Sequence, residues 1–234
     1  LEGIERVPEE CFYECLSLKQ VNLPQSLREI GHSAFSNCDS LEMVNLPRNV
    51  ISIGELAFMW CKKLREINIP EGVERVRKEC FYECLSLKQV NLPQSLREIG
   101  HSAFYNCDSL EMVNLPRNIT CIENRAFMFC KKLREIDIPP GVEYVAEECF
   151  KYCVKLRNVI LPVSIRSIYP EAFLNCKRLQ FINLKSISFI GSGAFGYCGS
   201  LETLYVSTKL TDICHKAFLD FTRLLYFGPR RNTS

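Results

Sequence analysis

Phenylalanine recurs along the chain at a nearly constant interval, and this repeat constrains the fold more than any other feature. The interval is 23 residues at every step except one of 22, between Phe173 and Phe195. The ten members are Phe12, Phe35, Phe58, Phe81, Phe104, Phe127, Phe150, Phe173, Phe195 and Phe218. A unit this short cannot bury an apolar face alone, so successive units must stack and share a core. The repeat therefore predicts a solenoid.

Each unit carries one pattern around its phenylalanine. Cysteine follows three residues later in nine units, and leucine follows six residues later in all ten. An alternating stretch over 18–23 then ends at Pro24, which suits a short strand because proline has no N–H to donate to a ladder. After a second extended segment, we expect Gly31 to permit a turn and residues 33–38 to form one or two helical turns. The prediction is an α/β solenoid of about ten 23-residue coils with a parallel main sheet and short helices.

A longer duplication overlies the short repeat. Residues 10–49 recur as 79–118 with a single change, Ser36 to Tyr105, and a third, diverged copy begins near Glu147. The duplicated block is three units, or 69 residues, and indicates recent expansion rather than a function. We expect one solenoid domain over residues 1–228 and a polar C-terminal tail over 229–234.

The unit L-x-x-V-x-L-P-x-x-L-x-x-I-G-x-x-A-F-x-x-C resembles the BspA-type leucine-rich repeats from Gly3 to about Phe227. The chain departs from the pattern where Lys185 and Ser207 replace the strand-ending proline. The resemblance implies a leucine-rich repeat array. It also implies a non-enzymatic, adhesin-like virulence role at the cell surface or in the periplasm, with a host matrix or cell-surface protein as partner. Should no export signal precede Leu1, the expected location is the cytoplasm.

Two other function classes stay open beside the adhesin-like module. One is a self-associating structural solenoid, a homo-oligomer joined through edge coils or through an apolar patch on the strand face. The other is an intracellular protein-interaction scaffold, which many free thiols would favour because cytosolic cysteines stay reduced.

Composition and motifs argue against several classes of protein. A formal net charge of +2 gives no reason to expect a nucleic-acid partner. No apolar stretch approaches the roughly 20 residues of a membrane helix, so no membrane insertion is expected. Phosphate-binding and dinucleotide-binding glycine loops and an HExxH helix are missing from the sequence. His32 and His101 occupy the same repeat position three units apart, too far to share a proton or ligand. We expect no enzyme and no cofactor.

The 14 cysteines are expected to be mostly free and buried. Nine share one repeat position, so they stack in a parallel ladder about 4.8 Å or more apart, whereas a disulfide needs converging Cβ atoms about 3.5–4.5 Å apart. The irregular Cys121 and Cys214 leave room for one or two bridges. Pairs such as Cys11 with Cys15 supply only two ligands, so no metal site is expected.

The outward face of the main strands contains the candidate binding site. Outward positions form three columns, of which one alternates in charge and one is mostly asparagine, and both are interpreted as structural ladders. Large apolar residues interrupt these columns toward the C-terminal end, and exposed apolar clusters often mark contact sites. The candidate ligand-binding residues are Met112, Ile160, Phe181, Tyr205 and Tyr226.

A second candidate surface lies on the predicted helical side. Its residues are Met59, Trp60, Met128, Phe129, Tyr152 and Tyr197. The alternative interpretation is that these side chains pack partly between neighbouring helices.

Overall fold

Most coils contribute two short strands because their apolar residues alternate with polar ones and proline ends the first run. In the coil of Phe104 the first of these is reduced to an isolated bridge at Met112. The main-sheet strands are β2 (Gln20–Asn22), β4 (Met43–Asn45), β6 (Glu66–Asn68), β8 (Gln89–Asn91), β11 (Glu135–Asp137), β13 (Asn158–Ile160), β15 (Phe181–Ile182), β17 (Leu204–Val206) and β19 (Leu225–Phe227). The second-sheet strands are β1 (Arg6–Val7), β3 (Glu29–Ile30), β5 (Ser52–Ile53), β7 (Arg75–Val76), β9 (Glu98–Ile99), β10 (Cys121–Ile122), β12 (Tyr144–Val145), β14 (Ser167–Ile168), β16 (Phe189–Ile190) and β18 (Asp212–Ile213).

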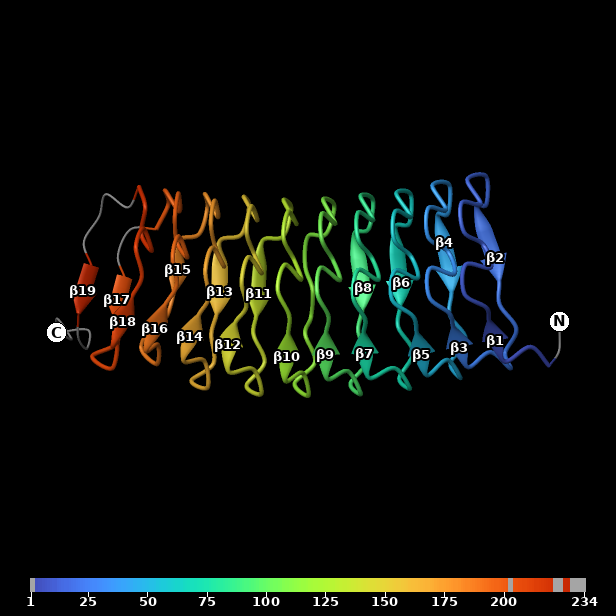
Figure 1. Cartoon of the computed structure of the whole chain (residues 1–234), viewed down its shortest axis with the longest axis horizontal. Coiled ribbons are helices and arrows are strands. Elements are labelled where there is room, and N and C mark those ends of the chain that lie inside the picture. Colours follow the sequence, from blue (N-terminus) through green and yellow to red (C-terminus); the bar gives the residue numbers. More distant parts are fainter. Residues whose placement is uncertain (1–2, 202–203, 221–224, 228–234) are drawn as a thin grey trace.

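The structure, a computed structural model, describes residues 3–201, 204–220 and 225–227, with the backbone alone for 205 and 225–227. The coils follow one another along the long axis, and the main and second strands form two parallel rows (Figure 1). We number the coils 1 to 10 by their phenylalanine, from Phe12 to Phe218. The result is a β-solenoid of about nine complete coils, as the repeat predicts. The predicted boundary between the solenoid domain and the C-terminal tail, at residue 228, stays a prediction, because 228–234 lie outside the described residues.

Neighbouring coils pair their strands in parallel and in register with the repeat. In the main sheet Gln20 lies beside Met43, Glu66 beside Gln89, and Asn158 beside Phe181. The described pairs of the second sheet are also parallel. The predicted parallel main sheet is confirmed.

The phenylalanine column is the centre of the core. The rings of coils 2 to 9 have no exposed surface, and each stacks on the next coil's ring with centroids 5.4–5.6 Å apart. Phe12 in coil 1 is only partly buried and stacks on one neighbour, Phe35, at 5.0 Å. Each interior ring is therefore held by two neighbouring coils.

The predicted short helices are wrong: the part of the chain that the structure describes contains strands and turns but no helix. In the segment 33–38, the Ser36 N–H donates to the Ser33 carbonyl (3.0 Å), but the Phe35 N–H donates to Ala57 of the next coil (2.8 Å). Every second amide thus bonds between coils, as at Asn37 with Met59 (2.7 Å). In a helix all these amides would bond within the segment, and the inter-coil hydrogen bonds of this segment would be lost.

This turn segment places two residues of each coil in the left-handed region. The positions lie two residues before and two after the phenylalanine, such as Ser33 (φ 49°) and Asn37 (φ 60°), and only Gly193 among them is glycine. Left-handed backbone costs about 1–2 kcal/mol per residue with a side chain. The inter-coil hydrogen bonds, each worth about 0.5–1.5 kcal/mol net, offset this cost together with core burial.

Gly31 has a different role from the predicted one, since it lacks a positive φ. A Cβ on Gly31 would lie 2.6 Å from the Glu9 nitrogen and 2.9 Å from the Val7 carbonyl oxygen. Glycine is needed here because the backbones of two coils approach closely, not because the chain must turn.

The three-unit duplication is visible in the coil corners. At the first corner of a copy Ser26 Oγ donates to the Ile4 carbonyl, and at the second Asn49 Nδ2 donates to the Gln25 carbonyl, each at 2.8 Å. The third corner of the first two copies is glycine, Gly72 or Gly141. The second sheet is also interrupted at these glycine corners, between β5 and β7 and between β10 and β12. The 69-residue copy is thus a unit of hydrogen bonding as well as of sequence.

Candidate functional site

The outer face of the main sheet exposes the predicted apolar residues that the structure describes. In β4, β6, β8, β11 and β13 the middle residue is buried and its two neighbours face outward, because side chains alternate along a strand. Ile160 is 59% exposed, Phe181 63% and Met112 52%. These values are high for large apolar side chains, so the predicted exposure is confirmed for these three residues.

The strand register determines which of these residues lie together. Asn158 of β13 pairs with Phe181 of β15, so Ile160 and Phe181 lie on adjacent strands, diagonally across the same face. Met112 is bridged to Glu135 and lies three coils before Phe181. We call Ile160 and Phe181 the apolar pair; Met112 lies apart from it.

Tyr205 and Tyr226 continue the same face only as far as the backbone is described. Their backbones pair directly between β17 and β19. Their side chains lie outside the described residues, so their part in a binding site stays a prediction.

Polar ladders cover the outward face of the main sheet in the coils that precede the apolar pair. In the first column Arg65 pairs with Glu42 at 3.3 Å and Arg134 with Glu111 at 2.9 Å, while in the third column Asn91 donates to Asn68. These contacts join adjacent coils and support the structural interpretation of both ladders.

The cysteine column is a ladder of free, inward thiols, as predicted. All 14 cysteines are free, and eight of the nine column members are buried. Each of these eight thiols donates to the phenylalanine carbonyl of the preceding coil, as Cys107 does to Phe81 at 3.2 Å. Burial raises the pKa of Cys38 to about 11 and that of Cys198 to about 12. These thiols act as core residues and inter-coil donors, not as nucleophiles.

The irregular Cys121 and Cys214 are also free. Cys121 lies on the second sheet, where its sulfur is 3.8 Å from the hydroxyl of Tyr144. That hydrogen bond and partial burial raise the pKa of Tyr144 to about 12.

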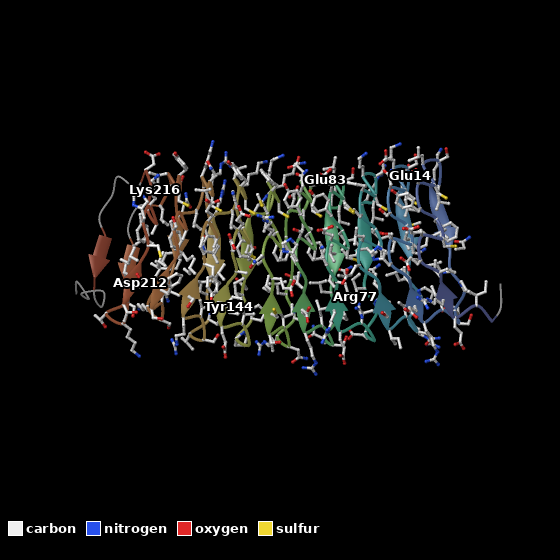
Figure 2. All side chains as sticks on the ribbon, viewed as in Figure 1. Glu14, Arg77, Glu83, Tyr144, Asp212 and Lys216 are labelled. Carbon is white, nitrogen blue, oxygen red and sulfur yellow. The ribbon has the colours of Figure 1, made fainter. Side chains whose placement is uncertain are left out.

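An aromatic cluster on the second-sheet side was missed by the sequence reasoning. Tyr144 contacts Tyr169 edge-on with centroids 5.5 Å apart, and Tyr169 lies 6.0 Å from Phe189. Figure 2 shows Tyr144 at the edge of the molecule formed by the second-sheet strands. Glu83 lies at the opposite edge, formed by the turn segments around each phenylalanine, which we call the turn edge. The available signal was the outward column of the second strands, which has only charged or small residues as far as Cys121 and then Tyr144 and Phe189.

The side chains of the second candidate surface pack mainly on one another along the turn edge. Of the predicted residues, Phe129 stacks on Tyr152 at 4.7 Å and Met128 is buried. Tyr82 and Tyr105, which were not among them, stack beside this surface at 4.4 Å. Tyr197 is 45% exposed. These contacts link neighbouring coils, and turns take the place of the predicted helices.

A compact ion cluster also lies on the turn edge. Glu148 accepts hydrogen bonds from Arg125 and Lys151, and Lys151 also contacts Glu171 at 2.6 Å. Burial acts to raise the pKa of Glu148, but the hydrogen bonds from Lys151 and Arg125 outweigh it and hold the pKa below its usual value. The cluster crosses three coils, which suits a stabilising role.

Among the residues that the structure describes, no three or more His, Cys, Asp and Glu side chains are grouped so that they could hold a metal ion. Within the same residues, no helix has the length and apolar character needed to cross a membrane.

Comparison with solved structures identifies similar solenoids. The T. pallidum leucine-rich repeat protein is 30% identical, with a TM-score of 0.52 over 86% of this chain and 74% of that one. A leucine-rich repeat protein from Bacteroides ovatus is 24% identical, with a TM-score of 0.60 over 82% of this chain and 68% of that one. No curated protein matches the chain.

A family model described as a BspA type leucine rich repeat region, with six copies, matches residues 2–111 and 97–224. Repeats of this kind are suited to protein–protein interaction, and their solenoids are typically non-catalytic binding scaffolds. The chain belongs to the BspA-type leucine-rich repeat family.

Proposed function

We propose that the chain is a non-enzymatic, adhesin-like module at the cell surface or in the periplasm that attaches to host matrix or cell-surface protein. The observation that carries this proposal is the exposed apolar pair, Ile160 and Phe181, on a sheet whose other outward residues are largely charged or amide. Family membership supports a protein partner, because these repeats are suited to protein–protein interaction.

The arrangement around the pair fits the anatomy of a protein interface. Binding energy is concentrated in a few apolar or aromatic residues, and polar neighbours exclude water around them. Asp137 lies beside Ile160 in the register, and Asn158 lies beside Phe181. An aromatic ring on a short strand also loses little conformational freedom on binding.

The free thiols favour an intracellular location, the alternative to the cell surface or periplasm. Ten of the 14 cysteines are buried and all are unbridged, which suits a reducing compartment and hence an intracellular protein-interaction scaffold. Burial also protects thiols outside the cell, so the adhesin-like role stays our first proposal.

The test compares binding to immobilised fibronectin, laminin and collagen, and attachment to epithelial cells. The double variant Ile160→Asp, Phe181→Asp should lose at least about tenfold in affinity for any protein that the wild type binds. Met43→Asp is the matched control, because Met43 occupies the same column as Phe181 and is 37% exposed. Its affinity should stay within about twofold of the wild type.

Solution mass, measured for all three proteins, separates attachment from self-association. A double variant that becomes monomeric from an oligomeric wild type would assign the pair to a homo-oligomer. Equal binding by wild type and double variant, with unchanged thermal stability, would overturn the proposed surface. Binding only to partners from the producing cell's cytoplasm would favour the intracellular scaffold.

A further inference from the structure

The third copy of the duplication differs from the first two in charge along one edge of the solenoid. This edge is where each turn segment leads into the main strand, four, five and seven residues after the phenylalanine. From coil 6, the last of the second copy, to coil 8 it carries Lys132, Lys155, Arg157, Lys177 and Arg178, which we call the basic edge. Lys155, Lys177 and Arg178 are the cations that the third copy adds, because Lys132 and Arg157 correspond to Lys63 and Lys19 of the first copy. None of these five side chains has an ion pair or hydrogen bond in the described part of the chain.

At the position of Lys177 the first two copies have an aspartate, which pairs with a lysine of the next coil. Lys62 pairs with Asp39 at 3.0 Å, and Lys131 pairs with Asp108 at 3.7 Å. At the position of both aspartates the third copy has Lys177. The fold is the same at all three sites, so structure alone does not require the reversed charge.

Two neighbouring positions of coil 8 also change, one by losing a negative charge and the other by gaining a positive charge. Glu42 and Glu111 bind arginines of the next coil, but their counterpart is Gln180. Ser40 and Ser109 correspond to Arg178. The third copy therefore loses both acidic partners and gains two cations on one coil.

The repeat arranges these cations in a line along the solenoid axis. The Arg157 N–H donates to Arg134 (2.8 Å), and the Gln180 N–H donates to Arg157 (2.9 Å), so these coils are in direct backbone contact. The core rings of coils 6 to 8 are spaced by 5.6 and 5.4 Å. Lys132, Lys155 and Arg178 thus recur once per coil at the same short interval.

We propose that the basic edge binds a linear sulfated polysaccharide laid along the solenoid axis. Regularly spaced cations without protein partners match a chain with regularly spaced sulfate groups, which Lys and Arg bind through charge-assisted hydrogen bonds. Phe181 adjoins Gln180 and exposes an aromatic ring beside this line, where a sugar ring can pack.

Duplex nucleic acid fits the edge less well than a single polysaccharide chain. The line is narrow, the exposed Glu135 lies in the adjacent column, and the net charge of the whole chain is only +2. Long-range attraction to a duplex needs a broader positive field.

The test is the affinity of the full chain for a heparin fragment, measured at several salt concentrations. The triple variant Lys155→Ser, Lys177→Asp, Arg178→Ser restores residues that the first two copies already carry at these positions, so folding is not at risk. Its affinity should fall about tenfold or more, and the slope of log affinity against log salt should become shallower by about three. Lys63→Glu, Lys88→Glu is the matched control, with the same change in net charge on coils 3 and 4, and should lose about twofold at most.

Three results would overturn the proposal: no heparin binding by the wild type, equal loss in the triple variant and the control, or tighter binding of duplex DNA than of heparin at the same salt. De-sulfated heparin should not bind. The apolar pair is unchanged in the triple variant, so its binding to matrix protein separates this proposal from the proposed function.

Discussion

Replacing Phe104 by alanine should destabilise the solenoid by about 3–5 kcal/mol. The ring has no exposed surface and lies between Phe81 and Phe127, with both centroids 5.4 Å away. Truncation removes the buried ring and leaves a cavity in contact with two neighbouring coils. Each lost aromatic contact costs about 0.5–1.5 kcal/mol in addition to the lost burial. The loss of stability should therefore lie in the upper part of the 3–5 kcal/mol range.

Phe12→Ala is the matched control for this prediction. Phe12 is partly exposed and stacks only on Phe35, so the loss should be about half as large or less. Urea unfolding followed by circular dichroism gives both free energies. A loss below about 1 kcal/mol for Phe104→Ala, or equal losses for the two variants, would refute the two-sided burial of the column.

Three other predictions concern the thiols, the backbone and the ion cluster. A thiol reagent should modify the exposed Cys11 first and at most four cysteines of the native protein, but all 14 after denaturation; fast native modification of more than four would contradict the buried ladder. Gly193→Ala, at φ 64°, should cost about 1–2 kcal/mol, whereas Gly199→Ala should be nearly neutral, and equal effects would refute the strain argument. Glu148→Gln should destabilise at neutral pH, and the difference from wild type should shrink as acid protonates Glu148, because a lowered carboxylate pKa stabilises only above it. A difference independent of pH would contradict this.

The sequence predicted the features that depend on periodicity. The 23-residue phenylalanine interval was sufficient for the stacked core, because only stacking can bury one large ring per short unit. Alternation in the strands similarly predicted that Ile160 and Phe181 face outward. The spacing of the cysteine column predicted free thiols, since equivalent residues of stacked coils cannot converge.

The sequence did not predict features that depend on contacts between coils. The spacing around residues 33–38 suits a helix, and only the inter-coil bond from Phe35 to Ala57 shows why turns form instead. The contact between Tyr144 and Tyr169 was missed because Tyr169 occupies a position that is glycine in several other coils. The basic edge likewise required knowing that Asp39 and Asp108 are paired in the first two copies.

The most direct test of the stacked-coil architecture is the detection of scalar couplings across hydrogen bonds by NMR in the perdeuterated protein. Such couplings identify the acceptor of each amide. We predict that the Phe104 amide couples to the Ala126 carbonyl of the next coil, and that the Cys107 amide couples to the Phe104 carbonyl within the turn. Coupling of the Phe104 amide to the Gly100 carbonyl, four residues before it, would indicate a helix and contradict the inter-coil bonding that joins the solenoid.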